Sequence, residues 1–126
     1  MTSQTQDRKL TLSELKSELQ DFHGTENYYK HWPGLLFTDG IHHLARKVNC
    51  VWLITLVASY QPEWKTKEHF QLWKISVKPD NTAVVTMRRD TNQPALIQQE
   101  LTFTDFPAGE FEWYCINGVM LLVNEY

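Results

Sequence analysis

Apolar residues recur at helical spacing near the start of the chain. Polar and charged residues separate them, so one side of this segment is apolar and the other faces water. The periodicity predicts a helix over residues 12–22. Thr11 and Glu14 have the spacing of a capping box at its start, and Gly24 is placed to end it. The apolar positions are Leu12, Leu15, Leu19 and Phe22.

The next segments extend the helical half of the chain. Residues 25–33 are expected to form a short helical turn, and a second helix is expected to begin after Thr38 and to be interrupted at Asn49. A third helix, over about residues 51–60, is apolar on nearly all sides and is expected to stop before Pro62. Because periodicity alone does not separate a buried helix from a buried strand, a strand is the competing interpretation of this segment.

From residue 69 the apolar period changes to strict alternation, which is typical of strands. Residues 79–81, Pro-Asp-Asn, suit a three-residue hairpin loop. A further strand is expected over about residues 96–104. The hairpin register keeps three apolar pairs on one face: Trp73 with Met87, Ile75 with Val85 and Val77 with Ala83.

The last hairpin carries the clearest local signal. Asn117-Gly118 between two apolar runs predicts a two-residue type I′ turn that pairs Cys115 with Met120. We therefore predict an α+β fold in which N-terminal helices pack on a C-terminal antiparallel meander of about five strands.

Both faces of this last hairpin are apolar. One face holds the residues expected in the core, and leaving the second face in water would favour aggregation. Either the segment over residues 28–37 covers the second face, or that face is an interface for a homodimer or for another protein. The second face consists of Tyr114, Ile116, Val119, Leu121 and Val123.

Length and composition narrow the class of protein. The chain has 126 residues, enough for one domain, which we place at residues 11–126 after a flexible tail over residues 1–10. The longest apolar run, Cys50 to Ala58, is far shorter than a membrane span, and the first residues do not resemble a signal peptide, so we expect no membrane association and a cytoplasmic location. Cys50 and Cys115 match no metal or redox motif and are expected to be buried free thiols.

The segment over residues 26–39 combines aromatic, amide, carboxylate and imidazole groups. These groups would suit a small-ligand pocket or an enzyme site in which His31 is the general base. The competing interpretation is that the aromatic residues fasten an irregular segment over the sheet. No catalytic residue, cofactor or metal site is assigned. No nucleophile or phosphate-binding motif is present, and His42 and His43, adjacent on a helix, point too far apart to hold one zinc ion together easily. A site formed by His31 with one of them and Asp39 or Glu26 is the disfavoured alternative. The pocket candidates are Glu26, Asn27, Tyr28, His31, Trp32 and Asp39.

Nucleic-acid binding is the remaining class of function. Basic residues of the hairpin over residues 74–89, with tryptophans nearby, would suit the binding of single-stranded nucleic acid. The formal net charge of −3, the interspersed acidic residues and the inward position expected for Trp73 argue against this use.

Several motifs together resemble a known family. They are Gly24-Thr25-Glu26-Asn27-Tyr28-Tyr29-Lys30-His31-Trp32, Phe37-Thr38-Asp39-Gly40, Phe70-Gln71-Leu72-Trp73-Lys74, Phe103-Thr104-Asp105-Phe106-Pro107 and Asn124-Glu125-Tyr126. Over about residues 12–126 the chain resembles a family of small bacterial proteins, frequent in cyanobacteria and on mobile elements, that is known only as a domain of unknown function. The resemblance implies a single cytoplasmic domain of bacterial or phage origin and supplies no activity, ligand or catalytic residue.

The leading hypothesis is a small non-enzymatic protein-interaction module, with a regulatory role if the mobile-element association holds. Its partner would be another protein or a second copy, bound through the last hairpin. A ligand binder or enzyme using residues 26–39 and a weak nucleic-acid binder using residues 74–89 are the alternatives.

Overall fold

The computed structural model of the chain describes residues 10–31 and 34–126, so the expected tail (except Leu10) and Trp32 lie outside the described residues. The described helices are α2 (Leu12–Leu19), α3 (Asp39–Lys47), α4 (Val51–Trp64) and a short 3-10 helix, η1 (Val123–Glu125). The described strands are β1 (Tyr28–His31), β2 (Leu35–Thr38), β3 (Phe70–Val77), β4 (Ala83–Arg88), β5 (Ala95–Leu101), β6 (Gly109–Ile116) and β7 (Val119–Leu122).

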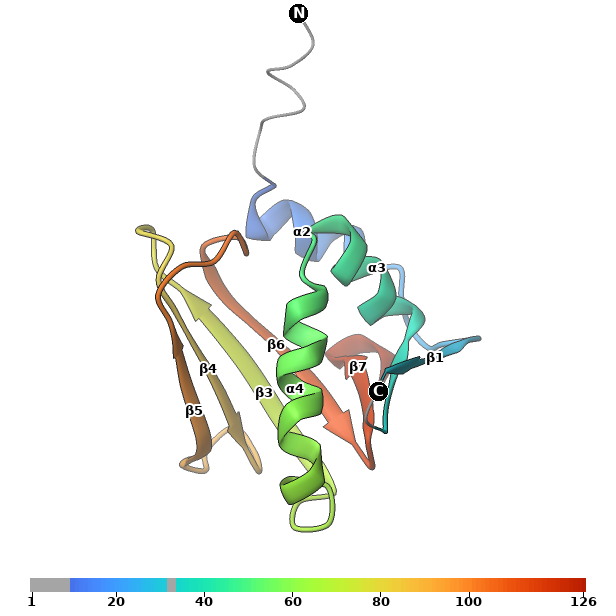
Figure 1. Cartoon of the computed structure of the whole chain (residues 1–126). Coiled ribbons are helices and arrows are strands. Elements are labelled where there is room, and N and C mark those ends of the chain that lie inside the picture. Colours follow the sequence, from blue (N-terminus) through green and yellow to red (C-terminus); the bar gives the residue numbers. More distant parts are fainter. Residues whose placement is uncertain (1–9, 32–33) are drawn as a thin grey trace, which may run out of the picture.

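The domain has two layers. The helices α2, α3 and α4 lie on one face of a seven-stranded sheet, and the apolar core fills the space between the two layers (Figure 1). We call the other side of the sheet, on which none of these helices lies, the open face. Strand residues therefore alternate between the core and the open face.

The sheet is larger than expected and is not a simple meander. The helices are also not all N-terminal to the strands, because β1 and β2 lie between α2 and α3, and η1 follows β7. The strand order of the sheet is β1-β2-β7-β6-β3-β4-β5, and all neighbours are antiparallel except β2 and β7. The expected five strands are present, but β6 pairs with β3 and not with β5. Residues 102–108 carry the chain past the end of the β3–β4 hairpin, where the backbone N–H of Thr104 donates to the carbonyl of Asn81 at 2.9 Å.

The two additional strands replace the short helical turn expected over residues 25–33. Tyr28–His31 and Leu35–Thr38 form an antiparallel pair, and β2 joins it to the main sheet through Leu36 beside Val119. Aromatic and β-branched residues fit a pleated surface better than a helical turn, and this preference prevails once a neighbouring strand supplies backbone partners. The described residues within 28–37 therefore extend the sheet and do not cover the second face of the last hairpin.

Helix α4 is helical as expected but continues beyond the expected stop. It ends at Trp64, with Pro62 inside its last turn. A proline removes one backbone donor, and at this position the loss affects only the final turn, so burial of the preceding apolar residues outweighs it. The helix buries Leu53, Ile54, Leu56, Val57, Ala58 and Gln61.

Both predicted hairpin registers are confirmed. Trp73 pairs with Met87 in the first hairpin, and Cys115 pairs with Met120 in the second. In the turn of the second hairpin, Asn117 and Gly118 have φ angles of 50° and 79°, the positive values that a type I′ turn requires.

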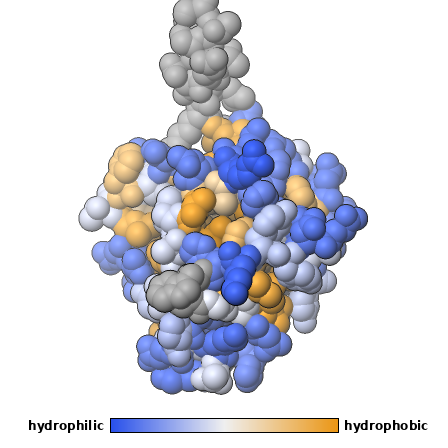
Figure 2. Space-filling view, turned by 45° about the vertical axis from the view of Figure 1, so that its right-hand side comes forward, coloured by the Kyte–Doolittle hydropathy of each residue, from blue (hydrophilic) through white to orange (hydrophobic). Residues whose placement is uncertain are grey.

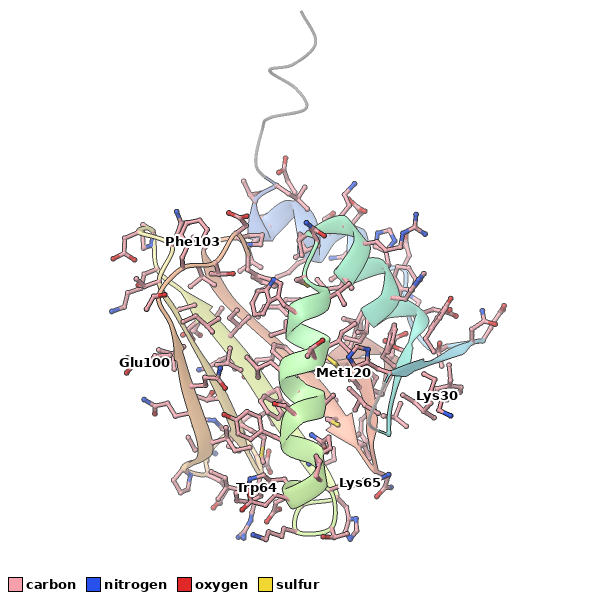
Figure 3. All side chains as sticks on the ribbon, in the orientation of Figure 1. Lys30, Trp64, Lys65, Glu100, Phe103 and Met120 are labelled. Carbon is pink, nitrogen blue, oxygen red and sulfur yellow. The ribbon has the colours of Figure 1, made fainter. Side chains whose placement is uncertain are left out.

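A buried amide pair joins α4 to the sheet. Gln61 and Gln71 donate to each other's side-chain oxygens at 3.0 and 3.1 Å, and the indole N–H of Trp73 donates to Gln71 Oε1 at 2.9 Å. Trp73 is fully buried and stacks on Trp113 with a centroid separation of 6.3 Å. The core around the Gln61–Gln71 amide pair is apolar. Met120, for example, projects from β7 toward the helices (Figure 3). The polar pair is tolerated because its members satisfy one another.

We expect the substitution Gln71→Leu to lower the free energy of unfolding by about 2–4 kcal/mol, because it leaves buried polar groups of Gln61 and Trp73 without a partner. Urea unfolding followed by circular dichroism measures this effect. The matched control is Gln98→Leu at an exposed position of β5, for which we expect little change. Equal stabilities of the two variants would contradict the structural role of the amide pair.

Candidate functional site

Three sequence segments that are far apart in the chain meet where β2 leads into α3. They are residues 24–29, residues 38–40 and residues 124–126, all of which belong to the motifs noted in the sequence. At their centre, the Asp39 carboxylate accepts hydrogen bonds from the backbone N–H groups of Glu26 and Asn27 at 3.0 and 3.2 Å. It also accepts from Asn27 Nδ2 at 3.3 Å and from the Tyr29 hydroxyl at 3.0 Å.

These donors fix the charge of Asp39. The backbone N–H of Glu26 makes the largest contribution, and together the donors lower the pKa of Asp39 to about 2. The same contact raises the pKa of Tyr29, because the hydroxyl donates to a carboxylate. Asp39 is thus an ionised acceptor that holds the loop before β1, and its oxygens are occupied by the protein's own donors.

A second carboxylate holds the other side of this corner. Glu125 Oε1 accepts from the Thr38 hydroxyl at 2.6 Å and from the backbone N–H of Leu122 at 2.9 Å. Its Oε2 accepts from the backbone N–H of Gly40 at 3.0 Å, at the first turn of α3. A negative charge is favourable at a helix N-terminus, and Thr38 caps the same helix through the N–H of Ile41. We call this set of contacts the Glu125 latch.

Position 40 requires glycine because Leu122 and Glu125 pack closely against its backbone. A Cβ atom at Gly40 would lie 2.5 Å from Leu122 Cδ1 and 2.6 Å from Glu125 Oε1. Next to the latch, Asn124 Nδ2 donates to the carbonyls of Leu19 and Phe22 at 3.0 and 2.6 Å and so caps the end of α2. No local pattern indicates the roles of Asn124 and Glu125, because their partners lie far away in the chain.

The structure separates the pocket candidates. Glu26, Asn27 and Asp39 lie together at a shallow hollow of about 430 Å³. Tyr28 is 60% exposed and lies on the open face, whereas the His31 ring contacts the Thr55 hydroxyl of α4 at 3.1 Å. The described candidates therefore do not line one common pocket.

The adjacent histidines His42 and His43 contact different neighbours. The His42 ring stacks on Tyr29 at a centroid distance of 4.2 Å. His43 Nε2 lies 2.7 Å from Glu18 Oε1, and this contact lowers the pKa of the Glu18 carboxylate. Within the part of the chain that the structure describes, no three His, Cys, Asp or Glu side chains are grouped closely enough to hold a metal ion.

The two cysteines are free and buried. Burial raises the pKa of both the Cys50 and the Cys115 thiol to about 12. A thiol at this pKa is protonated at neutral pH and is a poor nucleophile.

The interface candidates lie together on the open face. Tyr114, Ile116, Val119 and Leu121 are half-buried there, and Val123 just beyond β7 is 42% exposed. Neighbouring elements enlarge this apolar area: the rings of Phe70, Tyr114 and Tyr126 contact one another, and Leu36 of β2 is 37% exposed. We define the apolar patch as Tyr28, Leu36, Phe70, Tyr114, Ile116, Val119, Leu121, Val123 and Tyr126.

The remainder of the open face is polar. Lys74 lies 3.9 Å from Glu110, and Arg89 near the end of β4 forms an ion pair with Glu68 at 2.8 Å. Trp73 faces the core and is fully buried, so it is not available for stacking on a base. Carboxylates thus offset two of the basic groups on which the nucleic-acid hypothesis depends.

The chain is a small α+β domain whose sheet carries helices on one face and an apolar patch on the other. It belongs to a family of unknown function, DUF6876, whose sequence profile matches residues 13–126. No curated protein and no solved structure shows significant similarity to it.

Among the described helices, none has the length and apolar character needed to cross a bilayer.

We expect Asp39 to make stability depend on pH. Its pKa is lower in the folded chain than the ordinary value of 3.8, so its contribution is complete above that value and is lost as the pH falls toward about 2. The variant Asp39→Asn should therefore melt lower than wild type at neutral pH, with a smaller difference at acid pH. Thermal melts over this range test the expectation, with Asp105→Asn, at an exposed position, as the matched control. A difference that does not change with pH would contradict it.

We expect Glu125→Ala to reduce the free energy of unfolding by about 1–3 kcal/mol, because Gly40 N–H and the Thr38 hydroxyl lose their acceptor. Chemical denaturation provides the measurement. Glu100→Ala on β5 removes an exposed carboxylate and is the control. The Glu125 latch would be refuted as a stabilising element if both variants unfolded at the wild-type midpoint.

Proposed function

We propose that this chain is a small non-enzymatic protein-interaction module that pairs with a second copy of itself through the apolar patch. The observation that carries the proposal is the one-sided sheet: helices cover the core face, while large apolar side chains gather on half of the open face. Patches of this kind on a soluble domain mark sites of association.

The composition of the apolar patch favours a second copy over a transient partner. The patch is aliphatic and aromatic. The charged side chain of β1 is Lys30, which projects from this strand (Figure 3) and whose strand partner is Leu36 of the patch. Homodimer interfaces are more apolar than transient ones, whereas transient partners are selected more by charge. Tyr28 and Tyr126, 60% and 76% exposed, add the aromatic area that interface centres favour.

The patch also suits two-fold pairing. It occupies the β1, β2 and β7 side of the open face with the adjoining ends of β6 and β3, while the polar residues follow β4 and β5. Two sheets can pack face to face at about 10 Å with their strands turned by about 30°. If the two-fold axis passes through the patch, each polar half projects beyond the partner and stays in water.

Other features support a binding role. Asp39 is held by internal hydrogen bonds, and the thiols of Cys50 and Cys115 are protonated at neutral pH, so this carboxylate and these two thiols are poor candidates for a base or a nucleophile. We further propose that the protein acts in the bacterial cytoplasm, in a regulatory role linked to mobile elements. The family resemblance supports this placement, and two free thiols fit a reducing compartment.

Sedimentation equilibrium tests the pairing. We expect the wild-type chain to dimerise and Leu121→Lys to be monomeric, because a lysine at the centre of the patch would lose its hydration on burial. Gln98→Lys, on the polar half of the open face, is the matched control and should dimerise like wild type. Circular dichroism verifies that each variant is folded.

Two results would overturn the proposal. One is a wild-type chain that remains monomeric up to about 1 mM, where the association free energy would be weaker than about 4 kcal/mol. The other is a folded Leu121→Lys variant that dimerises as strongly as wild type.

A further inference from the structure

Strand β6 is paired along only half of one of its two edges. On one side it pairs with β3 along its whole length, from Gly109 beside Val77 to Ile116 beside Phe70. On the other side it pairs with β7, and that ladder ends at Trp113 beside Leu122. Among the described residues, no strand continues β7 alongside residues 109–112, because the chain turns there into η1.

The hairpin register tells which backbone groups point to this vacant side. In a hairpin with a two-residue turn, the residues flanking the turn form a hydrogen-bonded pair, and bonded pairs recur at every second residue. The bonded residues of β6 toward β7 are therefore Ile116 and Tyr114. The same alternation directs the N–H and C=O of Glu112 and Glu110 toward the vacant side. These groups form a short strand edge that can accept another strand.

A groove lies directly beside this edge. Its volume is about 850 Å³, in the range of binding clefts, and it is bounded by β6, by the residues after β7 and by the second half of α2 with the residues that follow it. Its floor is apolar: Leu19, Phe111 and Leu122 are at most 6% exposed. An extended segment laid along β6 would place alternate side chains on this floor.

The charges around the groove define the other side chains of that segment. Glu110 and Glu112 project on the open face, and Asp21 adds a third carboxylate to the lining of the groove. The basic groups of the lining are the ammonium group of Lys16 and the imidazole of His23. Glu110 is 68% exposed, and its contact with Lys74, at 3.9 Å, is long. Basic side chains opposite Glu110 and Glu112 would form favourable cross-strand pairs.

We propose that residues 110–112 bind an extended peptide segment of a partner protein by strand addition. The segment alternates apolar residues, which face Leu19 and Phe111, with basic residues, which face Glu110 and Glu112. Backbone hydrogen bonds supply affinity, and the alternation supplies selectivity. This site is separate from pairing through the apolar patch, although Val123 borders both.

The test uses a short amidated peptide that alternates lysine with valine, and a matched peptide in which glutamate replaces lysine. We expect the lysine peptide to bind with amide chemical-shift changes centred on Glu110 and Glu112, with slower hydrogen exchange at both amides. The glutamate peptide should bind at least tenfold more weakly, because it places carboxylates opposite carboxylates.

A variant pair separates backbone pairing from charge. Glu112→Pro removes the N–H that faces the vacant side and leaves the ladder to β3 intact, so we expect it to abolish binding. Glu112→Ala keeps this N–H and should weaken binding only severalfold. Leu121→Lys, which tests the apolar patch, should bind the lysine peptide like wild type, so the two proposals fail independently.

Three outcomes would overturn strand addition at β6. They are no binding of the lysine peptide at about 1 mM, equal binding of both peptides, and shift changes that avoid residues 110–112. The hydrogen-exchange measurement on the wild-type chain keeps the proposal testable if Glu112→Pro does not fold.

Discussion

The carboxylate of Glu125 connects parts of this domain that lie far apart in the chain. It accepts from Thr38 and Gly40, which join β2 to α3, and from Leu122 at the end of β7. Two interactions between remote segments meet there, the parallel pairing of β2 with β7 and the capping of α3. A carboxylate suits this position because it accepts several hydrogen bonds and is attracted to a helix N-terminus.

The features that could be predicted from the sequence are those that local chemistry decides. The alternation around Trp73 and Met87 and the Asn117-Gly118 turn fixed both hairpin registers, since each choice moves a whole apolar face into the core or out of it. Strands β1 and β2 escaped prediction because each is four residues long, and β2 joins the main sheet only through β7, from the other end of the chain. The α4 extension past Pro62 shows burial prevailing over a local stop signal.

The candidate site shows the same division. The mixture of carboxylate, amide and aromatic residues around Asp39 was visible in the sequence, but the groups that occupy the carboxylate are backbone N–H groups and a tyrosine hydroxyl aligned by the fold. Likewise, the apolar second face of the last hairpin was visible, while its neighbours Phe70, Tyr126 and Leu36 come from other elements. Residue types indicate which chemistry is available, and tertiary geometry decides whether it is already used.

The pairing of β2 with β7 also constrains how the chain folds during synthesis. Thr38 meets Glu125, which follows it by 87 residues, so this corner lacks its partners until Glu125 has left the ribosome. Until then, the apolar side of β2 and the adjoining helix start have no sheet to join, and contacts of such long range form slowly. A nascent chain that stalls before β7 would therefore leave these apolar surfaces exposed to chaperones and proteases.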